Sequence, residues 1–420
     1  GAPARPRSLA DDLRARTPAQ LTALISARPD LIHPMPGDLA AMAARAATSP
    51  SVSAALDTLD RYHLRVCEAL AGLSDPATTT QLHAGLRPVP GYDKRAVDTA
   101  VSRLRELGLV WGASLHLVRA AREAFGAYPC GLAASFRESR PLVRGYDHDP
   151  AALRELVAGA PAGVAQIVAD LLWTPAGTMP AATRRVDRAK ARTPLDWMLA
   201  HDIIVATGEQ TVVMPREVSL ALRNGQLVAD LTWQPVAIAT GAIDPARADA
   251  TGAQSAMEAV RLVETLLEAW SYAPPPVLRG GGLSTRDLAG VADLLRCDEA
   301  SAALVVEVAL AANLVAVGEA NRWVPTTAYD RWLSSPDTAR WATLASAWRA
   351  MPRSSHTVAD DRPMSSAADR AWVPGLRHAI VTALREQPSG TTVSAASLTD
   401  YLEWQRPRRS SHARDAAIVA

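Results

Sequence analysis

The side chains best suited to chemistry in this sequence are few, and none completes a recognised catalytic motif. Asp147, His148 and Asp149 alternate acids with an imidazole that could hold one metal ion or act as a dyad, but a lone histidine is more commonly a surface residue. Asp298 and Glu299 follow a cysteine like a helicase acidic box, yet they also suit the first turn of a helix. No GxSxG, HExxH or convincing acid pair occurs.

The two lysines of the chain exclude nucleotide hydrolysis by a P-loop. A P-loop places lysine before serine or threonine to hold the β- and γ-phosphates. Here Lys94 precedes Arg95, and Lys190 precedes Ala191. We therefore expect no enzymatic activity, no cofactor, no metal ion and no small-molecule substrate.

The densest run of basic residues precedes a predicted helix in the middle of the chain. It consists of Arg184, Arg185, Arg188, Lys190 and Arg192. Such side chains would contact DNA phosphates and give a salt-dependent affinity. The alternative is a solvated helix face or a mobile loop with no ligand.

A second basic candidate is a predicted helix that opens with Lys94 and Arg95 and continues through Arg103. The equivalent helix further along the chain, from Ala303 to Ala312, carries Glu307 and no basic residue, so we expect it to pack on protein and not on DNA. Eleven tryptophans raise the alternative of a stacking platform for single strands. Four of them fall at apolar positions of the repeated pattern and are expected in cores: Trp111, Trp197, Trp323 and Trp332.

The formal net charge of +1 predicts no strong nucleic-acid field around the whole molecule. Cys67, Cys130 and Cys297 are widely spaced, which argues against a zinc site or a disulfide framework and fits a reducing compartment. No apolar run approaches the ~18 residues of a membrane span, and no signal-peptide core opens the chain. We expect a cytoplasmic protein that does not contact membranes and that can associate with the nucleoid through DNA.

One pattern occurs three times: an apolar helix, a short strand, a tight turn, a second strand and another helix. The copies cover Ala100 to Val118, Leu195 to Met214 and Ala303 to Val324. Helical periodicity gives each helix one inward face, and glycine lets the two short strands reverse. With helices ahead of each copy, this order predicts winged helices. The expected fold is mainly α with small β wings, arranged as tandem winged-helix domains in an extended multi-domain array.

The same pattern divides the chain into expected domains. These are a helical segment (1–50), winged helix 1 (51–135), winged helix 2 with an extra strand at 227–235 (150–240), winged helix 3 with a C-terminal helix (253–352), and a fourth helical, winged-helix-like domain that looks truncated (370–420). Gly241 to Gly252 is expected to be a linker, and Pro352 to Ser366 a flexible polar segment.

Three stretches resemble a known family. Leu21 to Leu31, Leu39 to Arg45 and Leu104 to Gly112 are similar to the actinobacterial helicase-associated proteins that carry an XPB-like helicase N-terminal domain. The resemblance spans most of the chain and is strongest from Ser8 to Leu132. It implies an accessory of DNA transactions beside an XPB-type helicase. Members of this family continue into a helicase-like module, so any such module would lie beyond this fragment.

Three functional hypotheses follow. The first is a non-catalytic tandem winged-helix protein of DNA repair or helicase transactions, which binds DNA weakly through backbone contacts and docks a helicase or repair protein. The second is a pure protein–protein scaffold without DNA contact. The third is a transcription regulator with one operator-reading domain. The basic run from Arg184 to Arg192 distinguishes them.

Overall fold

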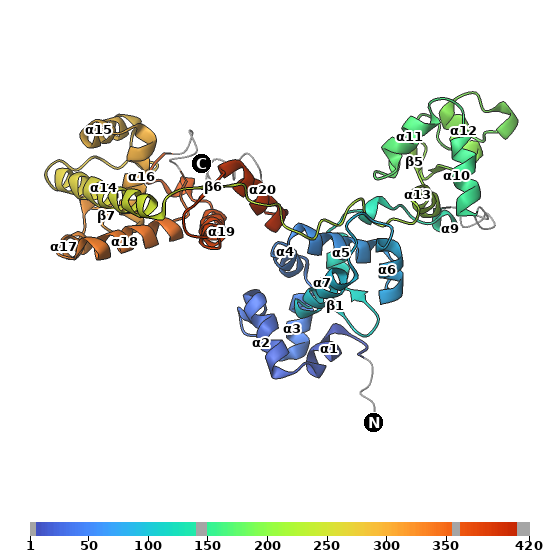
Figure 1. The fold of residues 1–420 in the computed structure, drawn as a ribbon, viewed down its shortest axis with the longest axis horizontal. Coiled ribbons are helices and arrows are strands. Elements are labelled where there is room, and N and C mark those ends of the chain that lie inside the picture. The colour runs from blue at the N-terminus through green and yellow to red at the C-terminus, as the bar shows by residue number, and fades with distance from the viewer. Residues whose placement is uncertain (1–5, 140–148, 355–361, 410–420) are drawn as a thin grey trace. The chain divides into compact units, whose positions relative to one another are not determined.

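The computed structural model describes residues 6–139, 149–354 and 362–409, and these are mainly helical with small sheets of two or three strands, as expected (Figure 1). The chain divides into two compact units. The first contains Gly1–Pro235 with Gln405–Arg409, and the second Val236–Trp404 with Ser410–Ala420. No helix among the described residues combines the length and apolar character needed to cross a lipid bilayer.

Short helices open the first unit where the sequence placed them. The elements are α1 (Leu9–Ala15), α2 (Pro18–Ala27), the 3-10 helix η1 (Pro29–Ile32), α3 (Leu39–Ala46) and α4 (Ser49–Leu56). The side chains of Ser8, Thr17 and Asp38 accept backbone hydrogen bonds at the starts of α1, α2 and α3. Leu13 and Leu24 are fully buried and tie these helices to one core.

Three helices and a two-stranded ribbon follow. They comprise α5 (Arg61–Gly72), α6 (Thr79–Leu86), α7 (Lys94–Glu106), β1 (Val110–Trp111) and β2 (His116–Leu117), and they are followed by α8 (Arg119–Glu123). Ala77, between α5 and α6, bridges Leu115 beside the ribbon. On α7, Val97, Ala100 and Leu104 are buried at helical spacing and leave one face outward. Gly112 takes a φ of +77° at the ribbon's turn, a conformation that favours glycine.

The same order recurs with one irregular part. The elements are η2 (Pro129–Gly131), α9 (Phe136–Ser139), α10 (Pro150–Ala158), α11 (Val164–Leu171), β3 (Ala176–Thr178), η3 (Arg188–Lys190), α12 (Pro194–Ala200), β4 (Val205–Ala206), β5 (Thr211–Val213) and α13 (Arg216–Leu222). The strands form one sheet in the order β3-β5-β4. Where α6 stands in the preceding repeat, this one has only the short η3.

The extra strand expected at 227–235 is wrong, since these residues are all described and form no strand. Two isolated backbone hydrogen bonds join this segment to the preceding repeat. The Leu227 N–H donates to the Gly85 carbonyl at 3.0 Å, and the Leu231 N–H donates to the Pro90 carbonyl at 3.1 Å. The alternation of apolar residues reflects this docking, in which Leu227 and Leu231 are buried without a neighbouring strand.

A buried arginine joins the two repeats of the first unit. The Arg223 guanidinium donates to the carbonyl oxygens of Cys130, Gly131 and Leu172, and it lies 3.8 Å from the centre of the Trp173 ring. Its side chain is only 3% exposed, and this burial lowers its pKa to about 10. The polar carbonyls therefore compensate the charge in place of water.

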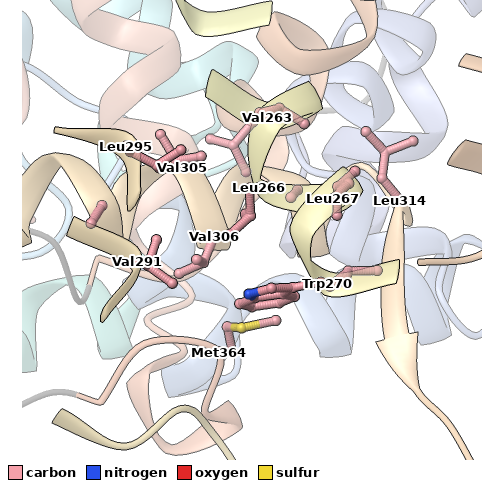
Figure 2. Close-up of a cluster of buried hydrophobic side chains, with 14 of the residues drawn as sticks. Val263, Leu266, Leu267, Trp270, Val291, Leu295, Val305, Val306, Leu314 and Met364 are labelled. Atoms are coloured by element: carbon pink, nitrogen blue, oxygen red, sulfur yellow. The ribbon is translucent and has the colours of Figure 1, made fainter. Parts of the chain in front are cut away.

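The second unit repeats the order again. It contains β6 (Thr240–Ala242), α14 (Pro245–Tyr272), α15 (Thr285–Leu295), α16 (Glu299–Ala311), β7 (Val315–Val317), β8 (Trp323–Pro325), α17 (Thr327–Leu333), α18 (Asp337–Ala350), η4 (Ser366–Ala368), α19 (Val373–Arg385), β9 (Thr391–Val393) and α20 (Ala395–Gln405). Figure 2 shows its core, where Leu266 and Trp270 of α14 lie near Val306 of α16 and Met364. Pro276 bridges Arg322 beside the ribbon, as Ala77 does in the first unit.

The linker expected from Gly241 to Gly252 is also wrong. Residues 240–242 form β6, which pairs antiparallel with β9, and α14 already begins at Pro245. Ile238 packs with the apolar residues of α19 and α20, among them Ile380 and Leu398. The segment ahead of α14 therefore completes the sheet and core of the C-terminal helices. The small residues of this segment did not predict its pairing with β9.

Candidate nucleic-acid interface

The basic run lies along the outer side of α12. Arg184 reaches the first turn of this helix, where its Nε and Nη2 donate to Oδ1 of Asp196 at 3.1 and 2.5 Å. Arg188 reaches the other end, where its Nε donates to the Ala200 carbonyl at 3.0 Å. Thr193 caps α12 by accepting from the Asp196 N–H. The run thus covers the helix that a DNA reader would place in a groove.

All five cations of the run are exposed, but they divide into two groups. Arg184 and Arg188 are held by α12 through the bonds just given. The side chains of Arg185, Lys190 and Arg192 make no hydrogen bond or ion pair with any residue that the structure describes. These three positive charges therefore face solvent with no counter-ion from the part of the chain that the structure describes.

Asp196 is the principal counter-charge within this site. Its side chain is 19% exposed, and hydrogen bonds from Arg184 and Thr193 lower its pKa below the usual value. Asp187 accepts from the Ala189 N–H at 3.0 Å and is the other acid in the run. The sequence contained both carboxylates, but only the fold shows that the Asp196 carboxylate holds Arg184.

The candidate residues on α7 lie in a less favourable setting. Lys94 pairs with Asp98 at 3.0 Å, and Arg103 pairs with Glu106 at 3.0 Å. Arg95 is exposed and makes no ion pair within the described residues. Asp98, whose pKa is lowered first by its bond to Lys94, also accepts from His83. Two of the three candidate cations on α7, Lys94 and Arg103, are thus paired with acids of the same helix, and Arg95 stays exposed.

The N-terminal helices cover the end of α7, a contact that sequence analysis missed. Arg16 donates from Nη1 to the Glu106 carbonyl at 3.1 Å and from Nη2 to the Arg105 carbonyl at 2.5 Å. Asp12 accepts from the Gly112 N–H of the ribbon at 3.2 Å. No motif marks these partners, because they lie about ninety residues apart in sequence. These bonds occupy the carbonyl end of α7, while Thr99 and Ser102 on its outer face stay exposed.

The third equivalent helix, α16, is enclosed by its own unit. Ala302, Val306 and Glu307 are fully buried, and the Glu307 carboxylate accepts from Arg353 Nε and the Met364 N–H, both at 2.7 Å. The chain's own segment after α18 supplies these partners of α16. Asp298 and Glu299 open α16, where Asp298 accepts from the Ser301 N–H as a helix cap.

The remaining chemical candidates have structural partners or lie outside the described residues. His83 lies between Tyr92 and Asp98, and His201 stacks on Trp197 at 4.2 Å. Trp323 and Trp332 are buried as expected, whereas Trp111 and Trp197 are half-buried. Asp147 and His148 lie outside the described residues, and Asp149 caps α10. Within the described ranges no three His, Cys, Asp or Glu residues gather as a metal site would require.

Comparison with known proteins finds no matching protein family, no similar curated protein and no similar solved structure.

Proposed function

We propose that this chain is a non-catalytic DNA-binding accessory protein built of three winged-helix domains. The topology supports this, because helices followed by a two-stranded ribbon recur three times. In each repeat, the segment that follows the first helix lies beside the second strand of the ribbon. The repeat around α12 departs from the pattern by having η3 for its middle helix. We propose both that these repeats are winged-helix domains and that they bind DNA.

The observation that carries the DNA proposal is the exposed run over α12. Arg185, Lys190 and Arg192 have no protein counter-ion among the described residues, so a phosphate can approach without displacing one. Each phosphate neutralised by such a cation releases counter-ions from DNA and makes binding depend on salt. This is the chemistry of backbone contact.

The proposed contact is weak and independent of base sequence. The run itself reaches both ends of α12, Arg16 contacts the last turn of α7, and α16 is largely buried in its own unit, so we place the contact on the DNA backbone and not in the major groove. Phosphate contacts alone give dissociation constants of roughly 10⁻⁴ to 10⁻⁶ M at physiological salt. The same contacts give no support to a transcription regulator that reads an operator.

A helicase or repair protein is the proposed partner, and this rests on the family resemblance of Leu21 to Leu31 and Leu104 to Gly112. The rival function, a scaffold that contacts only proteins, is favoured by the contact of Arg16 with α7 and the burial of α16. A function as a scaffold would not explain the exposed cations between Arg184 and Arg192, and we therefore favour DNA binding.

A salt titration of duplex and forked DNA binding tests the proposal. We compare the wild-type chain with a variant in which Arg184, Arg185, Arg188, Lys190 and Arg192 are replaced by glutamine. Wild type is expected to bind at low salt, and the variant to lose most of that affinity. Absence of binding by wild type at low salt would exclude the DNA function and leave the scaffold.

Co-purification from the native cell tests the partner. Recovery of a helicase or repair protein with the chain is expected. Recovery of other proteins without any helicase, nuclease or repair protein contradicts this part of the proposal.

A further inference from the structure

The first half of α14 carries no packed face. Residues 245–259 contain no buried side chain, whereas from Val260 onward α14 contributes to the core of the second unit. A surface helix normally buries one apolar stripe, and helical segments of this length are marginal in water without tertiary packing. This half of α14 therefore lacks the contact that usually stabilises a helix.

An apolar stripe on this half borders an open groove. Ala250, Ala253 and Met257 lie at helical spacing and line a groove of about 960 Å³ between α14 and the start of α18. Across the groove stands Trp341. Met257 is 65% exposed and Trp341 41% exposed, so two large apolar side chains face solvent at one place. Such a surface gains free energy when an apolar helix covers it.

The charges beside the stripe indicate which helix fits. Arg247 precedes the small residues Gly252 and Ala253, and Glu258 follows them at a similar distance. If a second copy of α14 lies antiparallel, with the two-fold axis level with residues 252–253, Arg247 faces Glu258 of that copy, and the reverse pair forms by symmetry. A parallel pair would place Arg247 beside Arg247, which is repulsive.

The side-chain sizes of the stripe also permit close packing. Ala250 and Ala253, its small residues, allow two helix backbones to approach closely. Arg261 already pairs with Glu258 at 2.5 Å and would remain beside it. A two-fold axis places identical patches against each other, so the face must be self-complementary, and this one is.

We propose that two copies of this chain associate through the first halves of their α14 helices, packed antiparallel in the groove beside Trp341. This surface lies in the second unit, away in sequence from the basic run at 184–192. The inference therefore stands or falls independently of DNA binding.

Sedimentation velocity of the full chain over a series of concentrations tests for the dimer. Reversing the charge at residue 247 or 258 tests whether the two helices pair as proposed. Wild type is expected to dimerise. Arg247→Glu and Glu258→Arg are each expected to be monomeric, because each variant places like charges together twice. An equimolar mixture of the two is expected to form a heterodimer, since both interfacial pairs then join opposite charges.

Arg286→Glu is the matched control, because Arg286 is an exposed arginine of α15 outside the groove, and it should leave the dimer unchanged. Met257→Asp is a second disruptive variant that leaves the ion pair of Glu258 and Arg261 intact. Circular dichroism melts establish that each variant is folded. A wild type that stays monomeric at all concentrations overturns the proposal, as does a dimer that withstands both Met257→Asp and the two charge variants.

Discussion

Arg184 holds Asp196 through the Nε and Nη2 edge of its guanidinium, with both nitrogens donating to Oδ1. This is the edge that arginine uses for a phosphate oxygen. The Nη1 atom donates instead to the carbonyls of Pro180 and Ala181. Asp196 therefore occupies the position that a DNA phosphate would need, and Arg184 is withheld from binding while the pair persists.

Replacing Asp196 by asparagine should strengthen DNA binding. The change frees the Nε and Nη2 edge of Arg184 for one further phosphate contact, which should steepen the dependence of log K on log salt by about 0.9. Fluorescence anisotropy at several salt concentrations measures this slope. Asp187→Asn removes the same charge from the same run without releasing an arginine, so an equal increase in slope in both variants would contradict the mechanism.

Neutralising only the cations without protein partners should abolish most of the binding. In the triple variant Arg185→Gln, Lys190→Gln and Arg192→Gln, up to three phosphate contacts disappear, and the salt slope should fall by about 2 to 3. Arg119→Gln is the control, because Arg119 is exposed and paired with Glu123. If the triple variant keeps the wild-type slope, the contacts lie elsewhere on the protein.

The pair of Arg184 and Asp196 should stabilise the fold only above acid pH. The folded pKa of Asp196 lies below its unfolded value, so its contribution is complete above about pH 4 and is lost as pH falls through the folded pKa. Urea midpoints measured from about pH 3 to pH 6 should fall more steeply for wild type than for Asp196→Asn. Parallel pH profiles would show that the pair contributes nothing.

Arg223→Met should destabilise the first unit strongly. The substitution leaves the carbonyls of Cys130, Gly131 and Leu172 without their shared donor and removes the contact with Trp173. We expect a loss of about 3 kcal/mol in the free energy of unfolding, measured by urea denaturation. Arg119→Gln serves again as the control and should leave the free energy of unfolding nearly unchanged, because its pair with Glu123 is exposed.

Breaking the buried pair of Glu307 and Arg353 should destabilise the second unit. Glu307→Leu leaves the Met364 N–H without an acceptor and leaves Arg353 with only Asp369 as a partner, at a cost of about 3 kcal/mol. Adding Arg353→Met should restore part of this loss, because the partly buried arginine is then removed together with the carboxylate that compensated it. Thermal melts of the single and double variants give the comparison. A double variant less stable than either single one would contradict this account.

Local pattern sufficed to predict most of the helices. A helical segment was predicted at 1–50 and a helix through Lys94 and Arg103, and the structure has helices at both places, because helical signals act within a few residues. The two failures were also local. Residues 227–235 alternate like a strand but dock singly on the first repeat, and 241–252 look like a linker although β6 pairs with β9 about 150 residues later.

The sequence by itself determined which chemistry this protein has available: no lysine placed for a P-loop, and one dense basic run between residues 184 and 192. The tertiary structure decided which of those charges face solvent. It brought Asp196 to Arg184, Arg16 to the end of α7, and Arg353 to Glu307. Ionic and hydrogen-bond partners depend on distances in space, and residues far apart in the chain come together only when their helices pack around a common core.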